Sequence, residues 1–179
     1  KIVSIVVTKS EIEEWINRNA FVRSDGKEWS AEHDASTFAS LIALEKVVKE
    51  KDLKHVVSFH GRIDRAKEFQ QLNSEIRKSD TAVADLSSFH VNGKLSTGDR
   101  AAILNRFVES ETSLLTNARC LTEGVDIPSV DCVLFADPRQ SKVDIVQAAG
   151  RAMRKSEGKK NGFIIVPLVV PDDRHLLAH

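Results

Sequence analysis

The 179-residue sequence contains only two cysteines, no long apolar run and no excess of charge of either sign. Cys120 and Cys132 lack the spacing of a metal site, and two reduced thiols are typical of a cytosolic protein. No apolar segment approaches the roughly 18 residues that a membrane helix needs, and no signal peptide is visible. Lys and Arg number 26, as do Asp and Glu. We therefore expect a cytoplasmic protein without a metal ligand set or a membrane partner, in which any basic surface is local.

Three nucleotide-binding motifs are also absent. The sequence has no G-x-x-x-x-G-K-[ST] loop, no acidic DEAD-like pair before a helix, and no G-x-G-x-x-G after a strand. The first two absences remove the loop that holds nucleotide phosphates and the carboxylates that hold Mg²⁺. The third counts against a dinucleotide ligand. Efficient ATP hydrolysis by this chain alone is therefore not expected.

Short β-branched runs alternate with longer amphipathic segments. The pattern predicts strands over residues 1–8, 55–61, 87–93, 112–118, 131–137 and 161–170, and helices over 10–19, 34–52, 63–79, 96–110 and 141–154. Ser10 with Glu13 is predicted to form the first capping box, and Ser96 or Thr97 to cap the fourth helix. Residues 21–32 are polar and predicted to form a loop. Strands separated by helices indicate an α/β fold with a mostly parallel sheet.

In such a sheet ligands bind beyond the carboxyl ends of the strands. The residues directly after each predicted strand are therefore candidates for a site. His60 ends one strand, and we interpret it as a structural strand-end histidine rather than as a ligand.

The predicted helix over 141–154 carries an unusual combination of residues. Gln147, Arg151 and Arg154 occur at i, i+4 and i+7 and share one stripe, whereas Ala149 belongs to an apolar stripe that should face the sheet. Gly150 lies between the stripes, where glycine costs about 1 kcal/mol relative to alanine. Close approach of a ligand or a neighbouring backbone would offset that cost. Two arginines suit a polyanion, but two arginines alone more often form a solvated basic face.

Four segments in order resemble the second RecA-like domain of superfamily 2 helicases and translocases. They are VVSFHGRIDRA, FHVNGKLSTGDRAAILNRF, LLTNARCLTEGVDIPSVDCVLFADP and QAAGRAMR, which match motif IV, a glycine-containing strand end, motif V and motif VI. The phrase DPRQSKVDIVQAAGRAMRK looks most like the helicase portions of restriction enzymes and related bacterial DNA helicases. The resemblance implies a RecA-like three-layer αβα sandwich.

The resemblance implies a nucleotide-facing role for motifs V and VI. Arg154 matches the arginine finger, and Arg151 also lies near the phosphates in the family. The positions beside the nucleotide are matched by Gly124, Asp126, Gln147 and Gly150. A plainer interpretation is that Gly124 forms a turn and Asp126 caps local backbone.

The resemblance also implies contacts with a nucleic-acid backbone. These fall on Arg62, Asn92, Gly93, Thr116 and Asn117. Arg62 stands where the family commonly has Ser or Thr. A guanidinium at this position could still hold a nucleic-acid phosphate. Thr116 alone would be an ordinary strand terminus.

The expected organisation is a helicase C-terminal domain over residues 1–170, with a lead-in over 1–50 and motifs IV to VI over 51–170. Residues 171–179 would begin the following segment, and an initial Lys1 suggests a piece of a longer or processed chain. The expected partners are DNA, with RNA not excluded, and the N-terminal RecA-like domain of the same protein. ATP with Mg²⁺ would be bound mainly by that missing domain.

Three hypotheses remain open from the sequence. The first is half of an ATP-dependent DNA motor, with a restriction-modification system as one setting. The second is a stand-alone nucleic-acid-binding module without ATPase activity. The third is an unrelated α/β enzyme that binds a nucleotide or nucleotide sugar at the carboxyl edge of its sheet.

Overall fold

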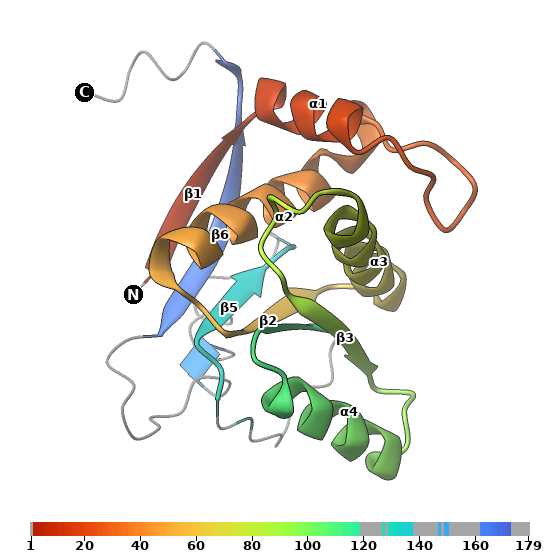
Figure 1. The fold of residues 1–179 in the computed structure, drawn as a ribbon, viewed down its shortest axis with the longest axis vertical. Coiled ribbons are helices and arrows are strands. Elements are labelled where there is room, and N and C mark those ends of the chain that lie inside the picture. Colours follow the sequence, from red (N-terminus) through yellow and green to blue (C-terminus); the bar gives the residue numbers. More distant parts are fainter. Residues whose placement is uncertain are drawn as a thin grey trace.

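The computed structural model describes residues 2–118, 127, 129–137, 147, 149–150 and 162–172. Figure 1 shows its elements, which are β1 (Ile2–Thr8), α1 (Lys9–Arg18), α2 (Ala31–Lys51), β2 (His55–His60), α3 (Ile63–Ser79), β3 (Ser87–Asn92), α4 (Thr97–Glu109), β4 (Ser113–Ala118), β5 (Cys132–Phe135) and β6 (Phe163–Val170). The predicted elements over these ranges are confirmed, with boundary shifts of a few residues. Of the predicted helix over 141–154, only Gln147, Ala149 and Gly150 are described, and they are helical.

The six strands form one sheet in the order β1-β6-β5-β2-β4-β3, and every named pairing is parallel. The last residues of β2 and β3, His60 and Asn92, are both in register with Ala118 at the end of β4. Three strands therefore end level at one edge. The turns that follow β2 and β3 therefore emerge on either side of the end of β4, which is the arrangement that makes a site at the carboxyl edge of a parallel sheet.

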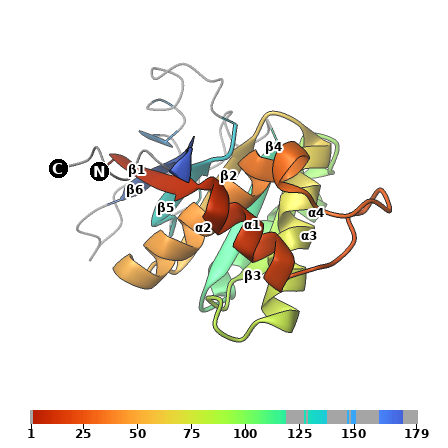
Figure 2. The same ribbon diagram turned by 90° about the horizontal axis from the view of Figure 1, so that it is seen from above.

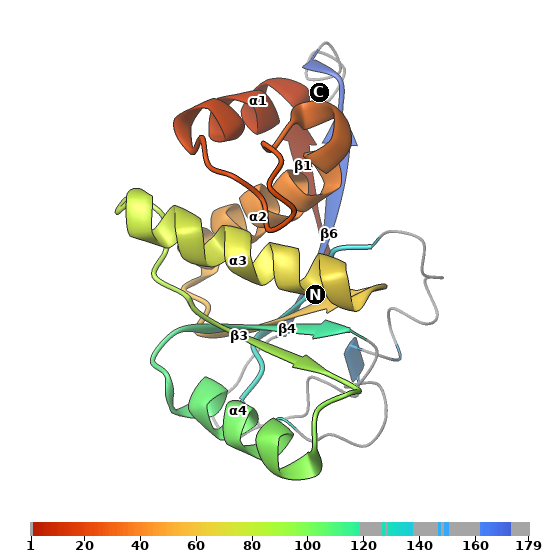
Figure 3. The same ribbon diagram turned by 90° about the vertical axis from the view of Figure 1, so that its right-hand side faces the viewer.

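Successive residues along the inner strands enter different cores. Val56 and Leu114 pack in a cluster with α2 and α3, whereas Val57 and Leu115 pack in a second cluster with Phe107 of α4. Side chains alternate between the faces of a strand, so both faces of the sheet are covered. Figure 3 shows α1, α2 and α3 on one side and α4 on the other, and Figure 2 looks down on the side that carries α1. The result is the expected three-layer sandwich, with apolar strands that lack a polar face.

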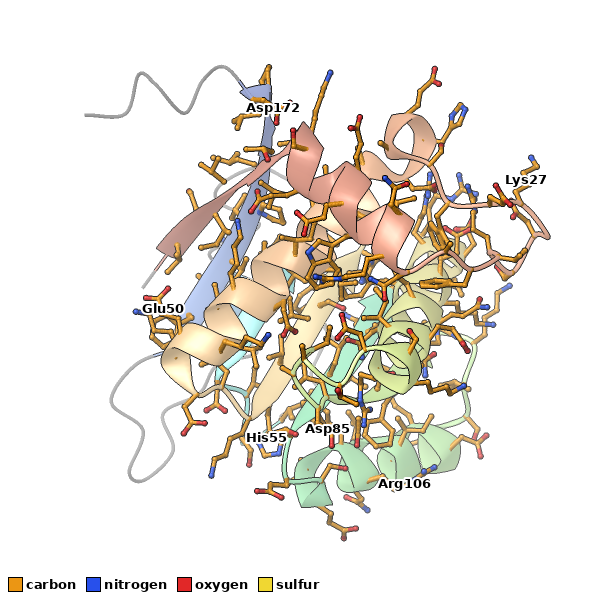
Figure 4. All side chains as sticks on the ribbon, turned by 45° about the horizontal axis from the view of Figure 1, so that its top comes forward. Lys27, Glu50, His55, Asp85, Arg106 and Asp172 are labelled. Atoms are coloured by element: carbon orange, nitrogen blue, oxygen red, sulfur yellow. The ribbon has the colours of Figure 1, made fainter. Side chains whose placement is uncertain are left out.

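The first helix begins earlier than the predicted capping box. Its N-cap is Thr8, which is both the last residue of β1 and half of a capping box with Glu11. Ser10 and Glu13 have the same residue spacing, but pairing of Thr8 with Val170 fixes where the strand ends. The Ser10 N–H donates instead to the carboxylate of Asp172 at 3.0 Å, so the end of β6 is tied to the start of α1 (Figure 4).

The loop between α1 and α2 is more ordered than its polar composition predicts. Val22 and Glu28 form an isolated antiparallel bridge, and Ser30 caps α2 four residues before the predicted start of that helix. Arg23 lies over the ring of Trp29 and donates to the fully buried carboxylate of Asp34 at 3.0 Å. The loop is therefore fixed to the first turn of α2.

No helix in the described part of the chain is long and apolar enough to cross a bilayer.

We expect Arg23→Met to lower the free energy of unfolding by about 2–3 kcal/mol, because it leaves the buried Asp34 carboxylate without its cation. Arg18→Met is the matched control. Arg18 also lies over a tryptophan, Trp15, and pairs with Asp80 at 3.4 Å, but it is half exposed. Its loss should cost less than about 1 kcal/mol. Urea denaturation measures both, and equal losses would contradict the role given to Asp34.

Candidate nucleic-acid interface

An open hollow of about 640 Å³ lies at the carboxyl edge, where β2, β3 and β4 end level. Its lining residues are Gly61, Arg62, Ile63, Asp64, Lys67, Gly93 and Ala118. The structure thus brings together Arg62 and Gly93, two residues proposed from the sequence that are 31 positions apart. It adds Lys67, which sequence reasoning missed because an isolated lysine on an amphipathic helix has the pattern of a solvated face. Two cations and an exposed glycine now share one concave surface.

The turn after β2 is closely packed at Gly61. A Cβ atom at Gly61 would stand 2.5 Å from the Asp137 carboxylate, well inside contact distance. Arg62 then takes an extended conformation as the N-cap residue of α3, without a side-chain capping bond. Its guanidinium instead donates through Nε and Nη2 to the carboxylate of Asp64, at 3.0 and 2.6 Å. This pair holds an exposed arginine at the start of a helix, where the dipole also favours anions.

The turn after β3 is built on Asn92. Its Oδ1 accepts a hydrogen bond from the Lys94 N–H at 2.9 Å, and its carbonyl accepts one from Leu95 at 3.3 Å. Gly93 is exposed within this turn, and no atom of another described segment lies within 4 Å of the position that a Cβ would take. The backbone at Gly93 is therefore open to a ligand, while Asn92 keeps its shape.

A chain of hydrogen bonds beneath the surface orients Asn92. The Thr116 hydroxyl donates to the carbonyl of Phe89 at 3.3 Å, so it accepts from Nδ1 of His90 at 2.9 Å. That leaves Nε2 of His90 as an acceptor, and Nδ2 of Asn92 donates to it at 3.0 Å. His90 is therefore neutral, with its proton on Nδ1. It links the β3 turn to the facing residue of β4, Thr116.

Thr116 and Asn117 are fully buried in β4 rather than exposed at the edge. The physical reason is the position of β4 between β2 and β3, with a core on each face. Direct contact between their side chains and nucleic acid, as the resemblance implied, does not fit this burial. Thr116 instead supports the surface through His90 and Asn92.

The structure describes only three residues of motif VI, namely Gln147, Ala149 and Gly150. Gln147 and Gly150 are exposed, whereas Ala149 is buried in the core that contains Phe107. The predicted division of this helix into an outward polar stripe and an inward apolar stripe thus holds at these positions. Among the described residues no atom lies within 4 Å of where a Cβ on Gly150 would stand, so packing against them does not require the glycine. The predicted roles of four further residues lie outside the described residues: Gly124, Asp126, Arg151 and Arg154.

His60 has a structural position, as expected for a strand-end residue. Its Nε2 is 2.9 Å from the hydroxyl of Ser58, and its ring lies against Phe69. Burial, with a smaller effect from His90, lowers the pKa of His60 to about 3. The ring is therefore neutral throughout the physiological range.

The comparisons with known proteins agree with this architecture. Residues 39–156 match the family described as helicase conserved C-terminal domain. A solved structure, an ATP-dependent Type ISP restriction-modification enzyme LlaBIII bound to DNA, superposes on 96% of this chain with a TM-score of 0.73 and 26% identity. A DEAD-box domain, Mss116p domain 2 bound to an RNA duplex, shares the fold with a TM-score of 0.58 over 96% of this chain and 55% of its own, at 19% identity.

Two curated relatives are also helicases by name. The putative ATP-dependent helicase IRC3 of Saccharomyces cerevisiae is 29% identical over 65% of this chain. The probable helicase A859L of African swine fever virus is 39% identical over 42% of it. The chain spans 16% and 9% of these two proteins and 12% of the restriction enzyme.

The parallel sheet covered on both faces, together with the superposition on the DEAD-box domain, shows a RecA-like fold. The family match over residues 39–156 then places the chain plainly among helicase C-terminal domains.

Imidazole ¹⁵N NMR tests the hydrogen-bond chain. We expect His90 to be neutral at pH 7 with its proton on Nδ1. Burial and then the charge of Lys67 lower the pKa of His90, against a hydrogen bond to Thr116 that raises it. Lys67→Met should therefore raise that pKa, whereas Lys78→Met at the far end of α3 should leave it unchanged. A proton on Nε2 would contradict the proposed direction of all three bonds.

The folded state should lose stability as the pH falls below about 6.5, the ordinary pKa of histidine. His60 keeps a pKa of about 3 when folded, so the unfolded chain binds the extra proton between these values. Acid then favours unfolding, on the order of 2 kcal/mol at pH 5. Urea denaturation at pH 7 and 5 should show this loss and a smaller loss in His60→Gln. Exposed His33, changed to Gln, is the control, and an undiminished loss in His60→Gln would contradict the assignment.

Proposed function

We propose that this chain is the C-terminal motor domain of an ATP-dependent superfamily 2 DNA helicase or translocase. The observation that carries the proposal is the hollow at the carboxyl edge, which joins Arg62, Lys67 and Gly93 in a domain of the helicase family. Cations and open backbone suit phosphate oxygens without reading bases. The hollow is local, which reconciles a nucleic-acid surface with a chain of zero formal net charge.

The backbone contacts we propose come from Arg62, Lys67 and the turn that Asn92 shapes around Gly93. The guanidinium and the ammonium supply charge, and the exposed turn lets a strand approach closely. Thr116 acts from beneath, through His90, to fix Asn92. Asn117 belongs to the same buried strand end. The surface therefore follows a phosphate backbone and does not depend on base sequence.

The proposed nucleotide contacts come from motifs V and VI. Arg154 would act as the arginine finger, with Arg151 beside it, and both would neutralise charge that develops on the transferred phosphoryl group. Gly124, Asp126, Gln147 and Gly150 would face the nucleotide. The exposure of Gln147 and Gly150 in the described structure supports this, since both are open to a facing domain.

ATP and Mg²⁺ are assigned mainly to a partner RecA-like domain of the same protein, where bound ATP would supply the γ-phosphoryl group. In the described residues no group of three or more His, Cys, Asp or Glu side chains is placed to hold a metal ion. The sequence also carries no phosphate loop. These residues fit a domain that completes a nucleotide site rather than one that forms it alone.

DNA is the proposed substrate, and a restriction-modification system is one proposed setting. The likeness to the DNA-bound Type ISP enzyme, at 26% identity over almost the whole chain, supports both. The RNA-bound DEAD-box domain, at 19% identity, shares the fold.

Changing Arg154 to Ala in the full-length protein should abolish DNA-stimulated ATP hydrolysis, because a finger contributes about 10³–10⁵ in rate. Folding and DNA binding should remain. Lys159→Ala, in the same basic segment, is the control. Steady-state hydrolysis with and without duplex DNA measures the effect.

Retained hydrolysis in Arg154→Ala would refute the assigned role. DNA binding by the full-length protein without any hydrolysis would instead support a nucleic-acid-binding module without motor activity.

A further inference from the structure

A second cavity, of about 360 Å³, lies on the other side of the turn that contains Gly61 and Arg62. Both residues line this cavity as well as the hollow described above. The second cavity extends from that turn toward α2, where Ser36 and Thr37 form part of its wall. These two residues precede residue 39, at which the family match begins. A nucleic-acid strand bound over Arg62 would therefore border this cavity as well, because Arg62 lines both.

Thr37 provides an unused hydrogen-bonding group at the cavity. The residue is only 9% exposed, and its hydroxyl has no partner among the residues that the structure describes. Buried hydroxyls are normally hydrogen-bonded, within a helix often to the carbonyl four residues earlier. In Thr37 the hydroxyl lacks such a bond and remains accessible from the cavity, so it is placed to serve a ligand.

The two arginines of this cavity lie at its rim, whereas its inner wall includes uncharged side chains. Arg62 and Arg65 stand at its rim, both substantially exposed, and their side chains share the first turn of α3. His60 and Phe69 form inner wall, and His60 is uncharged because burial lowers its pKa. Asp137 also lines the cavity, beside Gly61, and repels an anion from that side. The favoured place for an anion is therefore between the two arginines and Thr37.

We propose that this cavity binds one phosphate group of the nucleic-acid backbone, next to the phosphate held over Arg62, Lys67 and Gly93. Arg65 supplies charge and Thr37 a hydroxyl donor, and Arg62 stands between the two phosphates. A planar guanidinium matches phosphate oxygens, and the start of α3 adds its dipole. This inference rests on the proposed function and extends the nucleic-acid surface onto α2.

Two substitutions separate charge from hydrogen bonding. Arg65→Gln removes a cation, so the slope of log affinity against log salt should fall by about 0.7 for single strands or about 0.9 for duplex. Thr37→Val keeps the shape of the side chain and loses only the hydroxyl. It should weaken binding about 10-fold with the salt slope unchanged. Since that hydroxyl has no partner in the described structure, stability to urea should not fall.

The measurement is fluorescence anisotropy with labelled oligonucleotides between about 50 and 200 mM salt, using the full-length protein. Lys78→Gln removes one positive charge from the far end of α3 and is the control for Arg65→Gln. Lys67→Gln reports on the first hollow. Loss of affinity in Lys67→Gln, with wild-type binding in Arg65→Gln and Thr37→Val, would overturn the second phosphate site and leave the proposed function intact.

Wild-type binding in all these variants would instead refute the nucleic-acid surface itself. Inorganic phosphate provides a further arm, followed by NMR at Thr37. If phosphate alone shifts this residue but neither substitution alters oligonucleotide binding, the cavity is a site for a small anion, and the proposal for a backbone phosphate is wrong.

Discussion

The level ending of β2, β4 and β3 is the constraint on which the candidate site depends. Parallel register places His60, Ala118 and Asn92 side by side, so the turns that leave β2 and β3 share one edge with the end of β4. A shift of one residue in either pairing would exchange the two cores and move the turns out of line. The alternation of Val56 and Val57 between the cores holds this register, because each face is buried in its own cluster. Packing far below the edge thus fixes the surface.

Polar groups inside the sheet connect the strand ends to the turn after β3. A histidine and a threonine on facing positions of β3 and β4 are an unusual choice for a covered sheet, since buried polar groups are costly unless paired. His90 and Thr116 satisfy each other, and the remaining atoms bond to Phe89 and Asn92. The neutral state of His90 is necessary, because an imidazolium has no acceptor to offer Asn92. The polar core therefore serves to shape one loop.

The sequence predicted the fold because its periodicities are local and strong. Helix and strand positions, the parallel sheet and the outward stripe with Gln147 all follow from spacing within single elements. The first capping box was placed wrongly, since Thr8–Glu11 and Ser10–Glu13 have the same spacing and only the pairing of Thr8 with Val170 separates them. The strand partner that decides between the two capping boxes lies 162 residues further along the chain.

The site was predictable in part for the same reason. Arg62 and Gly93 follow strands and were found from that position, whereas Lys67 and Thr37 lie on helices whose patterns indicate solvent and core. Thr116 was placed at the right strand end but on the surface, because a sequence does not show that β4 is an inner strand. Lys67 joins the candidate site only because β3 and β4 end beside α3, which a local pattern does not show.

Both cavities are lined by Arg62. The chemical groups that they share determine which ligands the surface can distinguish. Its groups are a guanidinium, an ammonium, a hydroxyl and open backbone, all of which suit phosphate oxygens that are the same for every base. A motor that moves along a strand gains from such a surface, since no position on the track binds much more tightly than the next. The Arg62–Asp64 pair keeps the guanidinium ordered without neutralising all its donors, because Asp64 takes Nε and Nη2 only. The remaining nitrogen, Nη1, is the group that a passing phosphate can use.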